Sequence, residues 1–343
     1  MEKLAVIAKV LELCPIEGAD KIERASVLGW HVVARKGLYN VGDLVVMIFP
    51  DSLVPKALLD ETYTGEQKVR LKTVKLKGQY SAGLLVPLQV LNKTAPAKEW
   101  VEGDEVSVYL GVEKWVAPAS SNIAGKGIGD FPTNIISKTD ELNFRSEPKA
   151  LEEISKTRFN GQEFVATLKC DGSSGTFIYK DGKFRVCSRN IELAETDGNA
   201  FWEVSRKYNL EEALSFGGSE LAIQGEVCGP GIQGNPMKLN ELTFFAFQLK
   251  NIKTWQWLDW DYTSCFCMLH KIPTVPVLHR FTANNFPSSE ELQKMANDAK
   301  YDNGRTNAEG IVIRSVTPIK SEVLQKPWWS LKVMNQPYDM KKG

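Results

Sequence analysis

The first 112 residues contain short apolar runs separated by glycine, proline and aspartate, which is the pattern of an all-β domain. The runs lie at residues 4–10, 30–35, 44–49, 70–77, 83–88 and 105–109. Several of them end at a turn signal such as Lys36-Gly37 or at Pro50. Many short strands with this punctuation are typical of a small barrel or sandwich. We therefore predict an all-β domain over residues 1–112.

From residue 148 onward the pattern indicates strands mixed with helices. Strand-like runs lie at residues 163–169, 176–179, 184–187, 221–228, 242–249 and 310–315. Asp181-Gly182 separates two of them, which is a strong hairpin signal. A helical pattern over 201–216 ends at two glycines, and Ser288 to Glu291 resembles a capping box that opens a helix to about Lys300. The pattern predicts an α+β domain over residues 148–343.

The intervening residues 113–147 combine Pro, Gly, Ser and Asn with little periodicity. Residues 120–127 are the loosest part, and residues 131–145 are more regular. We predict a linker that continues into an ordered approach to the second domain.

Composition is that of an ordinary globular protein with more than one core. The chain has 343 residues, of which 43% are apolar and 24% charged, and this length exceeds one comfortable core. The lack of a long apolar run and of a signal-like start predicts no membrane span and no secretion. Six scattered cysteines favour a reducing compartment, the cytoplasm or the nucleus.

Two local features leave alternatives open. Cys265, Cys267 and His270 have partial zinc-ligand spacing, but no second pair follows, so buried thiols are the alternative. The net charge is zero, yet residues 67–80 contain five basic residues and no acid. These are Lys68, Arg70, Lys72, Lys75 and Lys77. They indicate either a nucleic-acid contact or a solvated edge strand.

Lys169 is the first candidate for chemistry, in the stretch Lys169-Cys170-Asp171-Gly172 at the end of a strand-like run. A lysine attacks phosphorus only as the free amine, although its ordinary pKa is about 10.4. Desolvation or a nearby metal cation lowers that pKa. Asp171, two residues on, points to the same face in an extended chain. The alternative is a surface lysine before a turn.

Further charged and aromatic residues follow in the second domain. Glu226 lies inside an apolar strand, where it needs a partner such as a cation, a ribose hydroxyl or an arginine. Glu309 opens a second apolar strand, and Lys332 is a point cation suited to a phosphate. Arg189 lies at the end of the hairpin. Phe247 belongs to an aromatic strand that either packs in the core or presents one ring to a base.

The order of these residues resembles the covalent nucleotidyltransferase superfamily, which comprises ATP-dependent DNA ligases, RNA ligases and mRNA capping enzymes. The run Gly225-Glu226-Val227-Cys228-Gly229-Pro230-Gly231-Ile232-Gln233-Gly234-Asn235 resembles RNA ligases that seal nicks in duplex RNA. The β domain comes first, as in RNA ligases of the Deinococcus and Naegleria type. The stretch from Lys77 to Leu84 is also similar to tRNA-binding OB modules. The resemblance implies an OB-fold barrel followed by an α+β nucleotidyltransferase domain with antiparallel sheets.

The same resemblance implies a reaction. Lys169 attacks the α-phosphate of ATP to form lysyl-AMP, the AMP passes to an RNA 5′-phosphate, and a 3′-hydroxyl then expels AMP. Asp171, Glu226 and Glu309 hold magnesium or manganese, ions that prefer oxygen ligands. Lys332 contacts the α-phosphate, and Arg189 contacts the ribose or the RNA phosphate.

The resemblance also assigns residues to binding. Phe247 stacks on adenine, Glu226 touches the ribose, and Leu168 and Lys326 contact the nucleotide. Many relatives read K-x-K in the last motif, whereas this chain reads Ser330-Leu331-Lys332, and Lys326 could supply the missing charge. Arg145 is a candidate for the RNA 5′-phosphate. The alternatives are a DNA ligase, a guanylyltransferase or a non-catalytic RNA-binding protein, and a monomer is expected.

Overall fold

The computed structural model describes residues 3–59, 62–115, 125–301 and 304–342. The chain forms two compact units. The first unit contains residues 1–117, 142–149 and 336–343, and the second contains residues 118–141 and 150–335. Within the described ranges, no helix is both long and apolar enough to cross a membrane. The part of the predicted linker at residues 116–124 lies outside the described residues.

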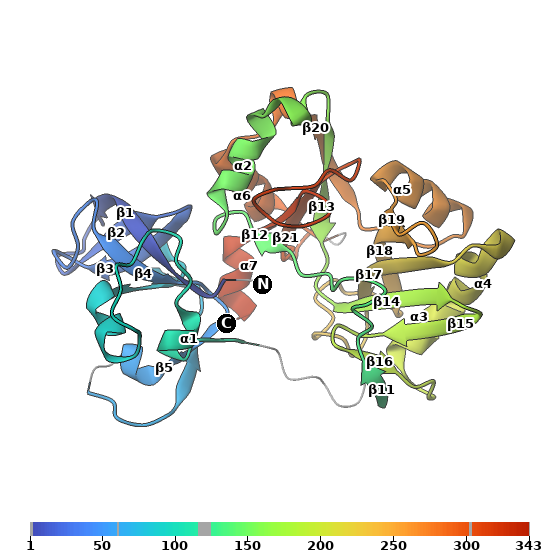
Figure 1. Ribbon diagram of the computed structural model, residues 1–343, viewed down its shortest axis with the longest axis horizontal. Helices are drawn as coiled ribbons and strands as arrows, with labels where there is room; N and C mark the ends of the chain where they lie inside the picture. The colour runs from blue at the N-terminus through green and yellow to red at the C-terminus, as the bar shows by residue number, and fades with distance from the viewer. Residues whose placement is uncertain (1–2, 60–61, 116–124, 302–303, 343) are drawn as a thin grey trace. The chain divides into compact units, whose positions relative to one another are not determined.

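The first unit is built on a five-stranded antiparallel sheet, as the short apolar runs predicted (Figure 1). Its strands, in spatial order, are β3 (Trp30–Arg35), β2 (Ile22–Val27), β1 (Ala5–Pro15), β4 (Leu44–Ile48) and β9 (Leu84–Pro87). A three-stranded sheet contains β10 (Glu113–Lys114), β5 (Ser52–Pro55) and β6 (Lys68–Arg70), and a hairpin contains β7 (Val74–Leu76) and β8 (Gln79–Ser81). The remaining elements are η1 (Lys56–Leu58), η2 (Leu88–Lys93), α1 (Ser107–Leu110), β12 (Leu142–Asn143) and α7 (Gln336–Lys342).

Both faces of this sheet are buried at the start of β1, which explains why its first four residues, 5–8, are all apolar. In β1, Val6 and Ala8 belong to one core cluster, while Ala5 and Ile7 belong to another. Because successive side chains of a strand point to opposite faces, each residue of the run meets a different core.

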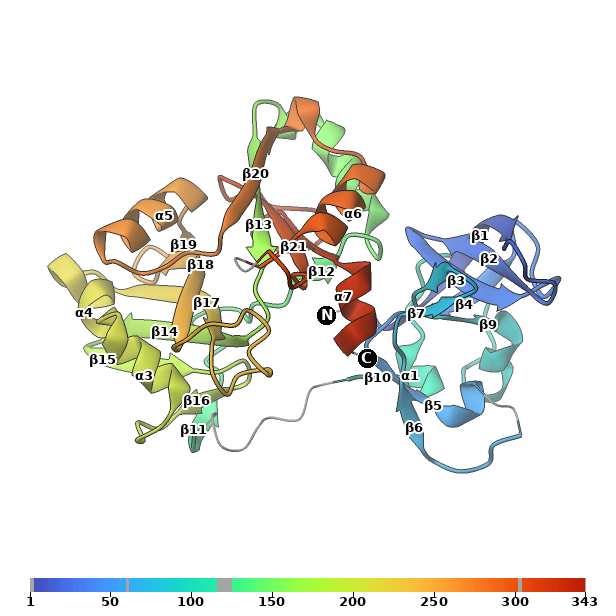
Figure 2. The same cartoon turned by 180° about the vertical axis from the view of Figure 1, so that it is seen from behind.

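The second unit contains two antiparallel sheets (Figure 2). The larger has the order β11 (Gly127–Asp130), β16 (Ile191–Leu193), β15 (Lys183–Cys187), β14 (Ser173–Lys180), β17 (Leu221–Cys228), β18 (Thr243–Asn251) and β19 (Gln256–Trp257). The smaller includes, in order, β22 (Ser330–Met334), β21 (Gly310–Ser315), β13 (Glu163–Lys169) and β20 (Val277–Thr282). The remaining elements are η3 (Glu153–Ser155), η4 (Thr157–Phe159), α3 (Ala200–Lys207), α4 (Leu210–Ser215), η5 (Phe216–Gly218), α5 (Trp260–Leu269), η6 (Ala283–Asn285) and α6 (Ser289–Asp298). The short helix α2 (Pro148–Glu152) begins in the first unit and ends in the second.

Helices cover one face of the larger sheet and a segment of turns lies on the other. Phe201 of α3 and Leu214 of α4 pack with Phe177 and Ile223 of the sheet in one core cluster. On the other face, apolar side chains of residues 131–136 pack against Ile178, Ala222 and Ile252. Residues 125–141, called the strap below, therefore form part of the second unit rather than a free linker.

Two local predictions differ from the structure in detail. The single helix predicted over 201–216 is two helices, because Asn209 between α3 and α4 adopts a left-handed conformation with φ of 47°. The strand predicted over 70–77 is divided between β6 and β7, which belong to different sheets. The hairpin at Asp181-Gly182 and the capping box at Ser288 are confirmed.

Candidate active site

Lys169 lies at the end of β13, where it meets a carboxylate carried by the neighbouring strand. Its Nζ donates a hydrogen bond to Glu309 Oε2 at 2.7 Å. The register of β13 and β21 pairs Lys169 with Gly310, so Glu309 lies immediately before the paired position. Both side chains are largely buried, with the lysine 24% and the glutamate 16% exposed.

Gly310 allows this arrangement because it has no side chain. Its φ is 152°, and a Cβ there would lie 2.1 Å from the carbonyl oxygen of Val333. Only glycine fits so close an approach of two backbones. The start of β21 can therefore pack tightly on β22, which fixes the position of Glu309 beside the lysine.

A second close approach brings Glu226 to the same place. A Cβ on Gly172 would lie 2.3 Å from the carbonyl oxygen of Val227 and 2.9 Å from Glu226 Cγ. The turn after Asp171 is thus pressed against β17, and β14 then pairs Ser174 with Glu226. The Lys-x-Asp-Gly turn and the Glu226 strand, more than fifty residues apart in the sequence, form one corner of the site.

The charges of this corner act on Lys169. Burial is the largest single influence on the pKa of Lys169 and lowers it, but the carboxylates of Glu309, Glu226 and Asp171 together outweigh burial, so the pKa is raised. Desolvation, one of the two causes predicted from the sequence, therefore does not by itself give Lys169 a lowered pKa in the protein, which leaves a nearby metal cation as the other. A cation at these carboxylates would weaken their hold on the ammonium and favour the free amine.

The pKa of Glu226 is also raised, but for a carboxyl group this favours the neutral form. Its pKa is raised to about 8, mainly by burial, with a further upward influence of Glu309 and Asp171 and an opposing influence of Lys169 and Arg189. Burial and the neighbouring carboxylates therefore disfavour the charged form of Glu226 more than the two cations stabilise it.

The donor chemistry fits a hard divalent cation. Asp171 is buried, and three carboxylates act electrostatically on one lysine. Across the described ranges, however, no three His, Cys, Asp or Glu side chains converge into a complete metal site, and this includes the partial zinc spacing of Cys265, Cys267 and His270. Magnesium is usually held by one or two carboxylates together with substrate phosphates and waters. The corner suits a cation that shares its ligands with a nucleotide.

Lys332 projects from the same face of the smaller sheet as Lys169. The register pairs Lys332 with Val312, which in turn pairs with Thr167 of β13. Because side chains alternate along strands, positions 167, 169 and 332 share one face. Leu168 projects to the opposite face, where its side chain is buried, and its backbone N–H donates to the carbonyl oxygen of Pro276 at 2.8 Å.

Phe247 lies on β18 and is held by an arginine that the sequence reasoning missed. Arg314 Nη1 donates to the carbonyl oxygen of Phe247 at 2.5 Å, and the guanidinium lies 5.2 Å from the ring centroid of Phe247 and 5.3 Å from that of Trp328. Arg314 is only 2% exposed. The available signal was an arginine inside an otherwise apolar strand.

Tyr301 is a second residue that the sequence reasoning missed. Its hydroxyl accepts the backbone N–H of Glu309 at 3.1 Å and donates to the carbonyl oxygen of Lys169 at 3.4 Å. The side chain is buried. One phenol group thus connects the backbones of the lysine and of its carboxylate partner, a relation that no local pattern reveals.

The strap holds two of the predicted cationic residues. Arg189 Nη2 lies 2.5 Å from Asp140 Oδ1, and both side chains are nearly half exposed. Lys326 Nζ lies 2.9 Å from Glu141 Oε2 and donates to the carbonyl oxygen of Asp140 at 2.5 Å. Residues 140 and 141 therefore join Arg189 and Lys326 from two distant parts of the sequence.

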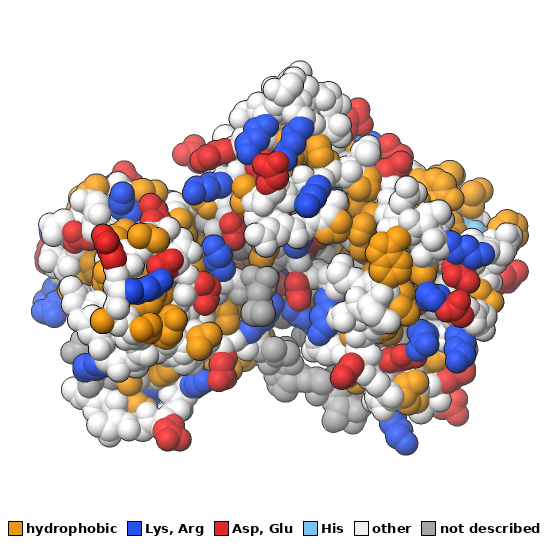
Figure 3. Space-filling model, in the orientation of Figure 1, with side chains coloured by type: hydrophobic (Ala, Val, Ile, Leu, Met, Phe, Trp, Pro, Cys, Tyr) orange, Lys and Arg blue, Asp and Glu red, His pale blue; other side chains and the backbone are white. Residues whose placement is uncertain are grey.

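The predicted RNA-binding residues all belong to the first unit, and they differ in their surroundings. Lys68 pairs with Glu113 at 2.5 Å, and Arg70 pairs with Asp51 at 2.6 Å. Lys75 lies over the ring of Tyr80. Lys72 and Lys77 flank β7, and on the face of the molecule in Figure 3 basic and acidic side chains are interspersed.

Arg145 is half-buried beside aromatic rings. Its guanidinium lies 5.8 Å from the ring centroid of Trp30 and 5.6 Å from that of Phe144. Burial lowers the pKa of Arg145 to about 10. Its backbone oxygen accepts the N–H of Gly29 at 3.2 Å.

Comparison with known proteins gives matches over both units. An RNA ligase family model matches residues 162–328, and an OB-fold domain model matches residues 4–88, so the predicted OB-fold barrel and nucleotidyltransferase domain are confirmed. No curated protein matches the chain by sequence.

Solved structures of an RNA ligase from Naegleria gruberi are similar to this chain over their whole length. The structure with pyrophosphate is 33% identical, has a TM-score of 0.85, and covers 99% of each chain. A variant with ATP and manganese is 33% identical with a TM-score of 0.86, again over 99% of each chain. A variant with AMP and manganese is 32% identical, with a TM-score of 0.86 and the same coverage.

Proposed function

Because the chain belongs to the RNA ligase family, we propose that it joins RNA ends, linking a 3′-hydroxyl to a 5′-phosphate in an ATP-dependent reaction. The observation that carries the proposal is the corner at Lys169, where one amine donates to Glu309 and is also under the electrostatic influence of Glu226 and Asp171. The similar Naegleria structures contain ATP or AMP with manganese, which supports ATP and a divalent cation for this chain.

The first step forms a covalent intermediate on Lys169. Its Nζ attacks the α-phosphorus of ATP, a P–N bond forms, and the bond to the β-phosphate oxygen breaks with release of pyrophosphate. Glu309 Oε2, at 2.7 Å from Nζ, is placed to hold the proton that the ammonium must lose. Magnesium or manganese, held by Asp171, Glu226 and Glu309, would neutralise phosphate charge and favour the free amine.

The next two steps transfer and release AMP. A 5′-phosphate oxygen of RNA attacks the phosphorus of lysyl-AMP, and the P–N bond breaks to regenerate the lysine. The RNA 3′-hydroxyl then attacks the activated 5′-phosphorus, and AMP leaves. Lys332, on the face of Lys169, would contact the α-phosphate, and Arg189 the ribose or the RNA phosphate.

The remaining residues bind the substrates. Phe247 would stack on adenine, while Leu168 and Lys326 would contact the nucleotide through backbone and ammonium, respectively. In the first unit, Lys68, Arg70, Lys72, Lys75, Lys77 and Arg145 would bind RNA, with Arg145 at the 5′-phosphate. We further propose a nicked RNA duplex as substrate, a monomer as the active form, and a cytoplasmic or nuclear location, in line with the six free cysteines.

The decisive experiment follows the label of α-labelled ATP into the protein with magnesium or manganese. Wild type is compared with Lys169→Ala and with Lys183→Ala, which removes an exposed lysine of the β14–β15 hairpin. We expect label that survives denaturing electrophoresis in wild type and Lys183→Ala, and none in Lys169→Ala. Absence of label from all three folded proteins would contradict the proposal.

Label transfer from GTP, nick sealing and RNA binding separate the proposal from other activities. Label from GTP but not from ATP would indicate a guanylyltransferase. Sealing of a nick with a DNA 3′-hydroxyl strand in preference to an RNA strand would indicate a DNA ligase. Binding of RNA without any label transfer would indicate a non-catalytic RNA-binding protein.

A further inference from the structure

Glu141, the last residue of the strap, lies between two cations from different parts of the second unit. Its Oε2 lies 2.9 Å from Lys326 Nζ, and its Oε1 lies 3.6 Å from Arg314 Nη2. Lys326 comes from the loop between β21 and β22, and Arg314 from β21 itself. One carboxylate thus serves two positive charges, and the trio retains one net positive charge.

The two cations differ in how strongly they need that carboxylate. Arg314 is 2% exposed and always charged, and its other partners are a neutral carbonyl group and two aromatic rings. A buried charge without a counter-ion is costly, so Glu141 is required by Arg314. Lys326 is 26% exposed, so its ammonium remains accessible to a ligand while it is paired with Glu141.

The position of Ser330 explains why the second lysine near the last motif comes from the loop before β22 rather than from the strand itself. It occupies the first position of the last motif, where many relatives have lysine, and the register of β21 and β22 places it directly opposite Arg314. Like charges at directly opposite positions destabilise a sheet. A lysine at position 330 would face the buried guanidinium, whereas Lys326 reaches the same neighbourhood with Glu141 between the two charges.

We propose that Glu141 is a positioning residue for ATP binding: its carboxylate offsets the buried charge of Arg314 and orients Lys326 so that the ammonium of Lys326 faces the triphosphate. This inference rests on the proposed function. Glu141 touches no reacting atom and acts through Lys326. The backbone oxygen of Asp140, at 2.5 Å from Lys326 Nζ, provides the second fixed contact that holds the ammonium in place.

The test is a double-mutant cycle on the self-adenylylation reaction, with Glu141→Gln, Lys326→Met and the double variant. We expect Glu141→Gln to raise the KM for ATP about tenfold and to leave kcat at saturating ATP within about twofold of wild type. In the double variant the KM should stay within about twofold of that of Lys326→Met, because the effect of Glu141 on ATP binding passes through the lysine, whereas its pairing with Arg314 contributes to folding stability. A purely structural role would give effects that multiply.

The control is Asp130→Asn, which removes an exposed carboxylate elsewhere on the strap and leaves the contacts of Glu141, Lys326 and Arg189 in place. It should change the KM for ATP by less than about twofold. If Glu141→Gln does not fold, Glu141→Asp retains the charge on a shorter side chain and should raise the KM by an intermediate amount.

Three outcomes would overturn the inference: an unchanged KM in folded Glu141→Gln, an unchanged KM in Glu141→Asp where only that variant folds, or multiplying effects in the double variant. These differ from failure of the proposed function itself. In that case wild-type protein would form no lysyl-AMP at all, whatever residue stands at position 141.

Discussion

At the scale of single residues, the site depends on small groups that hold the reactive ones. Gly310 and Gly172 permit backbone approaches that any side chain would block, and Tyr301 connects the strand end of Lys169 to Glu309. Each of these residues acts through the geometry of Lys169 rather than on the substrate. Their loss should therefore lower the rate of lysyl-AMP formation before it affects RNA binding.

Tyr301→Phe tests this expectation. The variant keeps the ring in its buried place but leaves the N–H of Glu309 without its acceptor, so Glu309 and Lys169 are held less firmly. We expect self-adenylylation to slow about tenfold, which corresponds to about 1.4 kcal/mol in the barrier, measured by label incorporation over time. Tyr262→Phe, at an exposed tyrosine of α5, should leave the rate unchanged. Equal rates for the two variants would show that the hydroxyl of Tyr301 does not contribute to lysyl-AMP formation.

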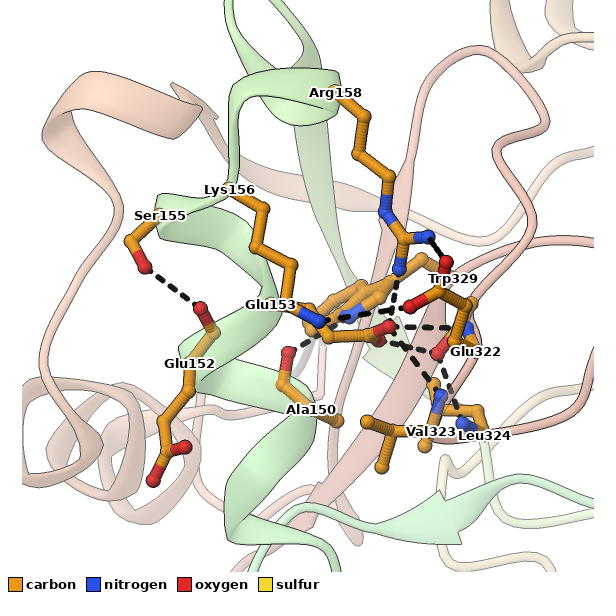
Figure 4. Close-up of polar contacts among 11 residues, drawn as sticks. Ala150, Glu152, Glu153, Ser155, Lys156, Arg158, Glu322, Val323, Leu324 and Trp329 are labelled. Atoms are coloured by element: carbon orange, nitrogen blue, oxygen red, sulfur yellow. Dashed lines mark hydrogen bonds and ion pairs between the residues drawn. The ribbon is translucent and has the colours of Figure 1, made fainter.

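Glu153 is a buried carboxylate that fixes the loop carrying Lys326 (Figure 4). It accepts hydrogen bonds from Ser321 Oγ at 2.5 Å and from the backbone N–H groups of Glu322 at 3.0 Å and Val323 at 3.3 Å. Arg158 forms an ion pair with it and a second, at 2.5 Å, with Glu322. This single side chain therefore attaches η3 to the β21–β22 loop.

We expect Glu153→Ala to destabilise the second unit by about 3 kcal/mol, because it strands a charged arginine and several buried donors. Urea unfolding followed by circular dichroism measures the change. The neighbouring Glu152→Gln is the matched control, since the side chain of Glu152 is exposed and points away from Glu153 in Figure 4. This variant should stay within about 0.5 kcal/mol of wild type. A loss below 1 kcal/mol in Glu153→Ala would show that the loop is held by other contacts.

At the scale of elements, the sequence patterns correctly predicted those strands, turns and helix starts that depend on interactions between neighbouring residues. The strand 163–169, the Asp181-Gly182 hairpin and the Ser288 capping box depend on neighbouring residues and are confirmed. The division of 201–216 into two helices depends on the left-handed Asn209, which no periodicity reveals. The contacts of Arg314 and Tyr301 come from residues 67 and 132 positions away, so their roles required the folded sheets.

The basic residues of 67–80 lie in two different elements, and we expect these elements to differ in how much they contribute to RNA binding. Lys68 and Arg70 of β6 are paired with acids, whereas Lys75 and Lys77 belong to the β7–β8 hairpin, whose β7 residues are all exposed. An existing ion pair must be broken before its lysine can bind a phosphate, so we expect the hairpin to carry most of the RNA contact.

The salt dependence of RNA affinity tests this division. Each lysine that contacts a phosphate contributes about 1 to the slope of log K against log salt. The double variant Lys75→Ala, Lys77→Ala should lower the slope by about 2, measured by fluorescence anisotropy on a labelled RNA duplex. Lys68→Ala should change it by less than half as much as one hairpin lysine. A larger effect from Lys68→Ala would reverse the assignment.

At the scale of the whole molecule, stability should depend on pH through a histidine of the first unit. Burial is the main cause that lowers the pKa of His31, with further lowering from Arg24 and Arg145 and an opposing influence of Glu12. Its Nδ1 lies 3.2 Å from Ser26 Oγ. The folded protein therefore holds His31 neutral at pH values where the unfolded chain, with a pKa of about 6.5, is already protonated.

Stability of the first unit should consequently fall as the pH drops below about 6.5, because the unfolded chain then binds the additional proton. His31→Gln should flatten this part of the profile, while His279→Gln, at an exposed position of the second unit, should not. Thermal unfolding followed between pH 5 and 7.5 compares the three proteins. A profile for His31→Gln that parallels wild type would assign the pH dependence to other groups.

The first unit is assembled from three separate stretches of the chain. Besides residues 1–117, the unit includes 142–149 and 336–343, and Gly29 illustrates the connection: its N–H donates to Arg145, and a Cβ there would lie 3.0 Å from Arg145 Cα. The barrel is therefore not a cassette that gene fusion could exchange by a single cut. A chimaera that exchanges the barrel would have to transplant three stretches of sequence together.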